Sequence, residues 1–153
     1  MNTISTAVFP PPLTGDVHRV ATTWMGKMHF ASSVNNHTIH IDKLKVHGGD
    51  DRGPRPKQLL LSAAAGCVGM ELMAILEKMR IEIGSLEINV SASLSDSVPK
   101  VYKEVQFEFL VKCNIEDRIK FEKALTLTLD KYCGVIAMFR NFAIVTHEIQ
   151  YVK

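Results

Sequence analysis

The sequence has no long run of like charges and no basic cluster with aromatic residues between its members. Its 18 basic and 16 acidic residues give a formal net charge of only +2, so it lacks the basic surface that nucleic-acid binding needs. No apolar run reaches about eighteen residues, the length that a membrane-spanning helix requires. We therefore expect a soluble, cytoplasmic protein with neither a nucleic-acid partner nor a membrane partner.

Cysteine is also scarce, and motifs for metal and cofactor sites are missing. The three cysteines are odd in number, widely spaced and without a CxxC pair, which argues against a disulfide framework or a zinc knuckle. The six histidines form neither an HExxH motif nor a closely spaced set with cysteine. No nucleophile elbow, dinucleotide fingerprint or phosphate-binding loop is present. We expect no metal and no bound cofactor.

The composition is that of a globular protein of about one domain. The 153 residues are 46% apolar and 22% charged, and a chain of this length can bury a core without staples. Residues 1 to 15 carry no charged side chain. Three consecutive prolines, 10 to 12, interrupt that segment and no basic region precedes it, so it does not resemble a signal peptide. We predict a flexible tail over residues 1–16 and a single domain over 17–153.

The longest apolar segment, residues 56–80, predicts a helix. Its apolar residues cover nearly every face, which is typical of a buried central helix. Pro56 suits the first turn, where a missing N–H is tolerated, and Lys78 and Arg80 suit the last turn.

The segments on either side of this helix predict strands and one further helix. Alternating apolar residues predict a hairpin over 86–111, with a turn at Pro99. From the N-cap candidate Asn114, apolar residues recur at steps of three and four as far as Tyr132. Two further segments read as strands: residues 17–41, as two or three strands, and 144–152 as a final one. Residues 45–55 read as a flexible connector. This order predicts the α+β class with antiparallel sheets.

Cys67 lies in the predicted central helix among alanines and two glycines. Each glycine inside a helix lowers the stability of the helix by about 1 kcal/mol relative to alanine, so we expect the small residues around Cys67 to serve a purpose that offsets this cost. They allow a substrate or another backbone to approach the sulfur, or they allow close helix packing with Cys67 as a core residue. Residue type alone favours packing.

Cys133 changes that balance, because the helical series extended by one step places it on the inward face of the second helix, beside Gly134. If the two cysteines come within disulfide distance, one can act as the reactive thiolate and the other as the resolving thiol of a peroxide-reducing or redox-sensing pair. The sequence leaves that distance open. Cys113 ends a predicted strand and reads as structural.

A reactive Cys67 needs a nearby cation. It lies eleven residues after Pro56, about 16 Å along an unbroken helix, too far to benefit from the N-terminal dipole. Glu71, one turn beyond, disfavours a thiolate unless it orients that cation. Three basic residues are candidates for the cation: Lys27, Arg55 and Arg140.

Two segments together, PRPKQLLLSAAAGCVGMELMAILEK and DKYCGVIAMFR, resemble the OsmC/Ohr family of thiol-dependent hydroperoxide reductases over about residues 17 to 152. The residues that match the family pattern are Pro56, Cys67, Tyr132, Cys133, Val135 and Met138.

The resemblance implies an α+β fold with two long central helices, an intertwined homodimer, and active sites at the subunit interface. It also implies that Cys67 attacks a peroxide to form a sulfenic acid. Cys133 then forms a disulfide with it, and a dithiol donor reduces that disulfide without a bound cofactor.

The chain departs from the peroxidase branch of this family at two positions. Lys57 stands where that branch has a glutamate, and Lys27 stands where it has an arginine. With Glu71 four residues after Cys67, the chain is more similar to a less characterised branch. The leading prediction is a thiol peroxidase. The alternatives are a dimeric redox-sensing or small-molecule-binding protein with weak or no turnover, and two cysteines that serve only in packing.

Overall fold

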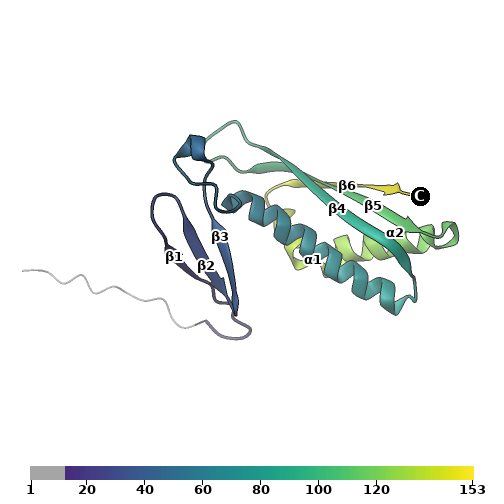
Figure 1. The fold of residues 1–153 in the computed structure, drawn as a ribbon. Helices are drawn as coiled ribbons and strands as arrows, with labels where there is room; N and C mark the ends of the chain where they lie inside the picture. Colours follow the sequence, from purple (N-terminus) through teal and green to yellow (C-terminus); the bar gives the residue numbers. More distant parts are fainter. Residues whose placement is uncertain (1–12) are drawn as a thin grey trace, which may run out of the picture. The chain divides into compact units, whose positions relative to one another are not determined.

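The computed structural model describes residues 13–153 and divides the chain into two compact units, Met1–Arg55 and Pro56–Lys153. Most of the segment predicted as a tail, residues 1–16, lies outside the described residues. The element order confirms the predicted α+β class: three strands, a long helix, a hairpin, a helical segment and a last strand (Figure 1).

The first unit is a three-stranded antiparallel sheet in the order β1-β2-β3. Its strands are β1 (Ala21–Trp24), β2 (Phe30–Val34) and β3 (His37–Ile41). Gly26 (φ 102°) and Asn35 (φ 53°) take left-handed conformations in the two turns, as glycine and asparagine do most readily. The prediction of two or three strands over residues 17–41 is confirmed.

The segment after β3, predicted to be a flexible connector, is a loop folded around the carboxylate of Asp42. That carboxylate accepts hydrogen bonds from the backbone N–H groups of Lys43 (2.7 Å), Asp50 (3.0 Å) and Arg52 (3.2 Å). A short 3₁₀ helix, η1 (Lys45–His47), lies inside the loop. Gly49 packs so closely against the Lys43 carbonyl that a Cβ there would collide with it.

The second unit is built on α1 (Pro56–Lys78), which begins at the predicted proline. It ends two residues earlier than predicted, and Arg80 adopts a left-handed conformation (φ 56°). The expectation of a helix buried on every side is wrong for the single chain. Only one stripe of α1 is fully buried: Ala64, Val68, Leu72 and Leu76. Leu60, Met70 and Met73 are exposed.

The sheet of this unit has the order β4-β5-β6, with β4 (Ile83–Leu94), β5 (Tyr102–Cys113) and β6 (Ile144–Tyr151). The antiparallel β4–β5 hairpin is confirmed. β6, however, runs parallel to β5, from Glu104 opposite Ile144 to Val111 opposite Tyr151, so this sheet is mixed and not purely antiparallel. The chain reaches β6 through the second helical segment, a connection long enough for parallel pairing.

The predicted second helical segment is confirmed over residues 115–132, but it is not one regular helix. It consists of η2 (Ile115–Asp117), α2 (Arg118–Leu127), a π-helical turn η3 (Thr128–Tyr132) and α3 (Gly134–Phe139). Asn114 precedes η2, but its side chain makes no capping hydrogen bond.

The core of the second unit lies between one face of the sheet and the helices, and α1 and α2 lie along that face in Figure 1. β5 contributes its inward side chains Tyr102, Val105, Phe107, Phe109 and Val111. The helices contribute the α1 stripe together with Phe121, Ala124, Leu125, Leu129, Ile136 and Phe139. This arrangement brings α1 against η3 and α3.

Candidate functional site

Cys67 lies near the middle of α1, at the edge of the buried stripe, and is half-buried. Because α1 is unbroken from Pro56 to Lys78, the two glycines beside Cys67 do not interrupt the helix. Gly69 lies against Ile88 of β4, where an added Cβ would stand 3.3 Å from Ile88 Cδ1. An added Cβ at Gly66 would meet no atom within 4 Å. Glycine at position 69 therefore permits close packing of α1 against β4. At position 66 no neighbouring atom restricts the size of the side chain.

Cys133 is buried, with 3% of its surface exposed, and lies in the break between η3 and α3. Its backbone is extended (φ −77°, ψ 101°), and its N–H donates to the Thr128 carbonyl at 2.9 Å, five residues back. A π turn contains one residue more than an α turn and is frequently found at functional sites. Here the π turn ends at Cys133, which the predicted regular helix did not anticipate.

The two thiols meet directly: Cys133 Sγ lies 3.0 Å from Cys67 Sγ. Burial, the contact with Cys67 and the charge that Cys67 would carry raise the pKa of the Cys133 thiol to about 11. The backbone N–H groups of Ile136 and Val135, in the first turn of α3, act in the opposite direction because they favour the thiolate. At neutral pH Cys133 is therefore a protonated thiol whose sulfur faces both Cys67 and two amide donors.

Cys113 stands apart from this pair. It is the last residue of β5, paired with Ile83 of β4, and half-buried. Burial raises the pKa of the Cys113 thiol. This position agrees with its interpretation as a structural residue.

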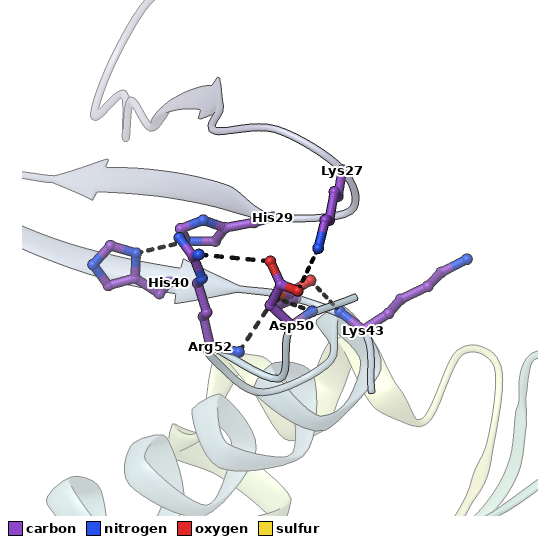
Figure 2. Close-up of polar contacts among 7 residues, drawn as sticks. Lys27, His29, His40, Lys43, Asp50 and Arg52 are labelled. Atoms are coloured by element: carbon purple, nitrogen blue, oxygen red, sulfur yellow. Dashed lines mark hydrogen bonds and ion pairs between the residues drawn. The ribbon is translucent and has the colours of Figure 1, made fainter. Parts of the chain in front are cut away.

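The side chains predicted to tune the Cys67 thiol have the following contacts. Lys27 Nζ pairs with Asp50 Oδ1 at 2.7 Å inside the first unit (Figure 2). Arg140 pairs with Asp130 of η3 at 2.8 Å. Glu71 is half-buried on α1 and makes no ion pair among the residues that the structure describes.

Lys57, which the resemblance predicts to replace a glutamate of the peroxidase branch, is the second residue of α1. Its backbone carbonyl accepts a hydrogen bond from the Tyr102 hydroxyl at 2.8 Å. This bond joins the start of the helix to the start of β5, and it uses the backbone of Lys57, not its side chain.

The first unit contains a second polar cluster that the sequence did not reveal. His29 Nε2 lies 2.9 Å from His40 Nδ1, and His29 is only 5% exposed (Figure 2). The two residues are eleven apart in the chain and meet because β2 and β3 pair in register. No group of three His, Cys, Asp or Glu side chains arranged for a metal occurs within residues 13–153.

The family model described as OsmC-like protein matches residues 48–148, which include both cysteines of the pair. The chain belongs to the OsmC-like family. Protein YhfA of Escherichia coli K12 is 25% identical over 130 residues, which cover 84% of this chain and 94% of YhfA.

Several solved structures share the fold. An OsmC-like protein from Mycoplasma pneumoniae has a TM-score of 0.77 at 16% identity and covers 92% of this chain and 100% of its own. A hypothetical protein from Aquifex aeolicus has a TM-score of 0.74 at 23% identity, and the match covers 91% of this chain and 100% of the Aquifex chain. The organic hydroperoxide resistance protein OhrB of Bacillus subtilis has a TM-score of 0.62 at 22% identity, covering 88% and 98%.

By length and composition α1 could cross a membrane. In the OsmC-like fold, however, it supplies a stripe of the core of the second unit. A core helix of a globular protein meets the same criteria of length and composition.

Proposed function

We propose that this OsmC-like protein reduces hydroperoxides, with Cys67 as the peroxidatic cysteine and Cys133 as the resolving one. The observation that carries the proposal is the 3.0 Å separation of the two Sγ atoms. A sulfenic acid formed at Cys67 would have a thiol within bonding reach, with only about 1 Å to close before the S–S distance of a disulfide. The organic hydroperoxide resistance protein OhrB, which shares the fold, supports the choice of substrate class.

The proposed reaction balances with these two sulfurs and an external dithiol. The Cys67 thiolate attacks the terminal oxygen of the hydroperoxide, the S–O bond forms, the O–O bond breaks, and the alkoxide leaves and takes a proton. The Cys133 sulfur then attacks the sulfenic sulfur, and its proton leaves with the hydroxide as water. A dithiol donor returns two electrons to the disulfide.

We further propose that the protein acts as a homodimer. Leu60, Met70 and Met73 are exposed on α1, and Met70 is 71% exposed. An open hollow of about 1040 Å³ has Met70, Met73 and Ile83 in its lining. A second copy would remove this apolar surface from water, at about 25 cal/mol per Å². We place the dimer in the cytoplasm, where a reducing environment keeps the thiols available.

Glu71, Lys27 and Arg140 are proposed to adjust the reactivity of Cys67. Glu71 is one turn away on the same helix, and Arg140 is paired to the π turn that precedes Cys133. The Lys27 ammonium pairs with Asp50, so its position within the first unit is defined.

The proposal is tested by peroxide consumption. The reduced protein is mixed with an organic hydroperoxide or hydrogen peroxide and dithiothreitol, and peroxide loss is followed over many turnovers. Cys67→Ser should abolish turnover, whereas Cys113→Ser, which removes the thiol outside the pair, should keep it. A Cys67→Ser protein with the full rate would refute the assignment.

A redox sensor with slow turnover is the second candidate. The protonated state of Cys133, whose pKa is raised to about 11, favours it because the neutral thiol attacks a sulfenic acid more slowly than a thiolate. Stoichiometric disulfide formation without rapid turnover would support this candidate.

A further inference from the structure

The two sulfurs of the pair differ in their access to solvent. Cys67 is half-buried on α1. The proposed dimer must leave a path to this sulfur, because the peroxide has to reach it as well. Cys133 is 3% exposed and belongs to the core cluster. Thiol–disulfide exchange requires a thiolate to reach a sulfur, so rates depend on which sulfur is accessible.

The two sulfurs also differ in what would stabilise a departing thiolate. Cys133 Sγ faces the N–H groups of Val135 and Ile136, which belong to the first turn of α3 and have no partner within the helix. Cys67 lies in the interior of the unbroken α1, where neighbouring N–H groups are bound to carbonyls four residues earlier. Backbone donors are therefore available at Cys133 and not at Cys67.

We propose that the reductant attacks the Cys67 sulfur of the Cys67–Cys133 disulfide, and that Cys133 is the leaving thiolate. A bond forms between the donor sulfur and Cys67 Sγ, and the Cys67–Cys133 bond breaks. The electron pair goes to Cys133 Sγ, which the amides of Val135 and Ile136 hold until it takes a proton. The second thiol of the donor then attacks the donor sulfur in the mixed disulfide, which frees the Cys67 thiolate and leaves an oxidised cyclic donor.

The raised pKa of Cys133 disfavours attack at Cys67, because a thiolate leaves a disulfide faster when the pKa of its thiol is lower. With a Brønsted slope of about 0.5, two pKa units would slow departure by roughly tenfold. Exclusion of the donor from a sulfur inside the core is the larger obstacle, because attack there requires the helices to separate. Access therefore decides the site of attack.

This inference rests on the disulfide of the proposed function but not on peroxide turnover. The full-length Cys113→Ser protein, which lacks the third thiol, is oxidised with diamide, and formation of the Cys67–Cys133 disulfide is confirmed by mass. Glutathione, a monothiol that cannot complete the second step, is added briefly. Acid quenching, alkylation and peptide mapping then locate the adduct.

We expect glutathione on Cys67 and alkylation on Cys133, with at least a tenfold excess over the reverse pattern, consistent with control by access. An adduct mainly on Cys133, equal labelling of both, or no disulfide with diamide would each overturn the inference. If the adduct forms on Cys67 but peroxide is not consumed, the inference stands and the peroxidase proposal fails.

Discussion

Cys67 Sγ and Cys133 Sγ lie 3.0 Å apart although 66 residues separate them in the chain. One sulfur comes from the middle of an unbroken α-helix and the other from the break between a π turn and a short helix. The packing of α1 against η3 and α3 holds them together, so the geometry belongs to the core and not to a loop.

Replacing Cys133 tests the resolving role. In Cys133→Ser, the sulfenic acid at Cys67 has no neighbouring thiol to condense with and should accumulate. We expect trapping by dimedone after one equivalent of peroxide, and steady-state turnover lower by on the order of tenfold or more. Mass spectrometry and a peroxide assay measure the two effects. Undiminished turnover, compared with Cys113→Ser, would contradict the role of Cys133.

Deleting Lys131 tests the π turn. This exposed residue lies within η3, and removing one residue should restore the regular α-helical ladder. Cys133 would then follow Thr128 by four residues, one α turn, in place of the five that now close the π turn, so it should stay one turn beyond Thr128 and keep facing Cys67. We expect the diamide-induced disulfide to form as it does in Lys131→Ala, which keeps the chain length, while circular dichroism shows a folded protein in both cases. Loss of the disulfide in the deletion variant alone would show that the π turn itself is needed to position Cys133.

Much of the fold could be predicted from periodicity. Apolar and polar residues alternate in β4 and β5 because each strand buries one face. The long apolar run of α1 is visible in the sequence because much of the surface of that helix is apolar. The parallel pairing of β6 could not be predicted, since alternation defines the faces of a strand but not its direction relative to its neighbour.

The site was predictable to a different degree. The three-and-four spacing that ended at Cys133 placed it inward, and it is buried. The π turn has no comparable sequence signal, because it changes the backbone while the apolar spacing continues. Asp42 was missed for another reason: its amide donors at Asp50 and Arg52 approach only after the chain folds back.

The stability of the protein should depend on the ionisation of Cys133 at alkaline pH. Burial and Cys67 raise the pKa of this thiol from 9.0 to about 11 in the folded state. The stabilisation from keeping it neutral is complete below about pH 9 and is lost as pH rises towards 11, because the unfolded chain releases its proton first. We expect a loss on the order of 1 kcal/mol, since part of a two-unit shift is screened near the half-exposed Cys67.

Denaturant unfolding at several pH values between 8 and 11 measures this loss. Cys133→Ala is the reference, because Tyr151 and Cys113 also have raised pKa values and remain in both proteins. The free energy of unfolding of the wild type should fall faster with pH than that of the variant. Parallel curves would show that Cys133 does not contribute.

The loop from Lys43 to Arg52 should depend on the carboxylate of Asp42. Burial alone would raise the pKa of this group, but the N–H groups of Arg52, Asp50 and Lys43 outweigh burial and hold the pKa below its ordinary value. The loop should therefore keep its hydrogen bonds at neutral pH and lose them only as pH falls below about 4. Asp42→Asn removes the charge and one of the two acceptor oxygens. At least one amide should then lose its acceptor and exchange its hydrogen faster, on the order of tenfold.

Asp51→Asn is the matched control for the loop prediction. Asp51 is exposed and lies in the same loop with a left-handed backbone (φ 58°), which asparagine tolerates. Its replacement removes the same charge without touching the three amides, so exchange at Lys43, Asp50 and Arg52 should stay as in the wild type. If both variants accelerated exchange equally, loss of charge and not loss of the acceptor would be the cause.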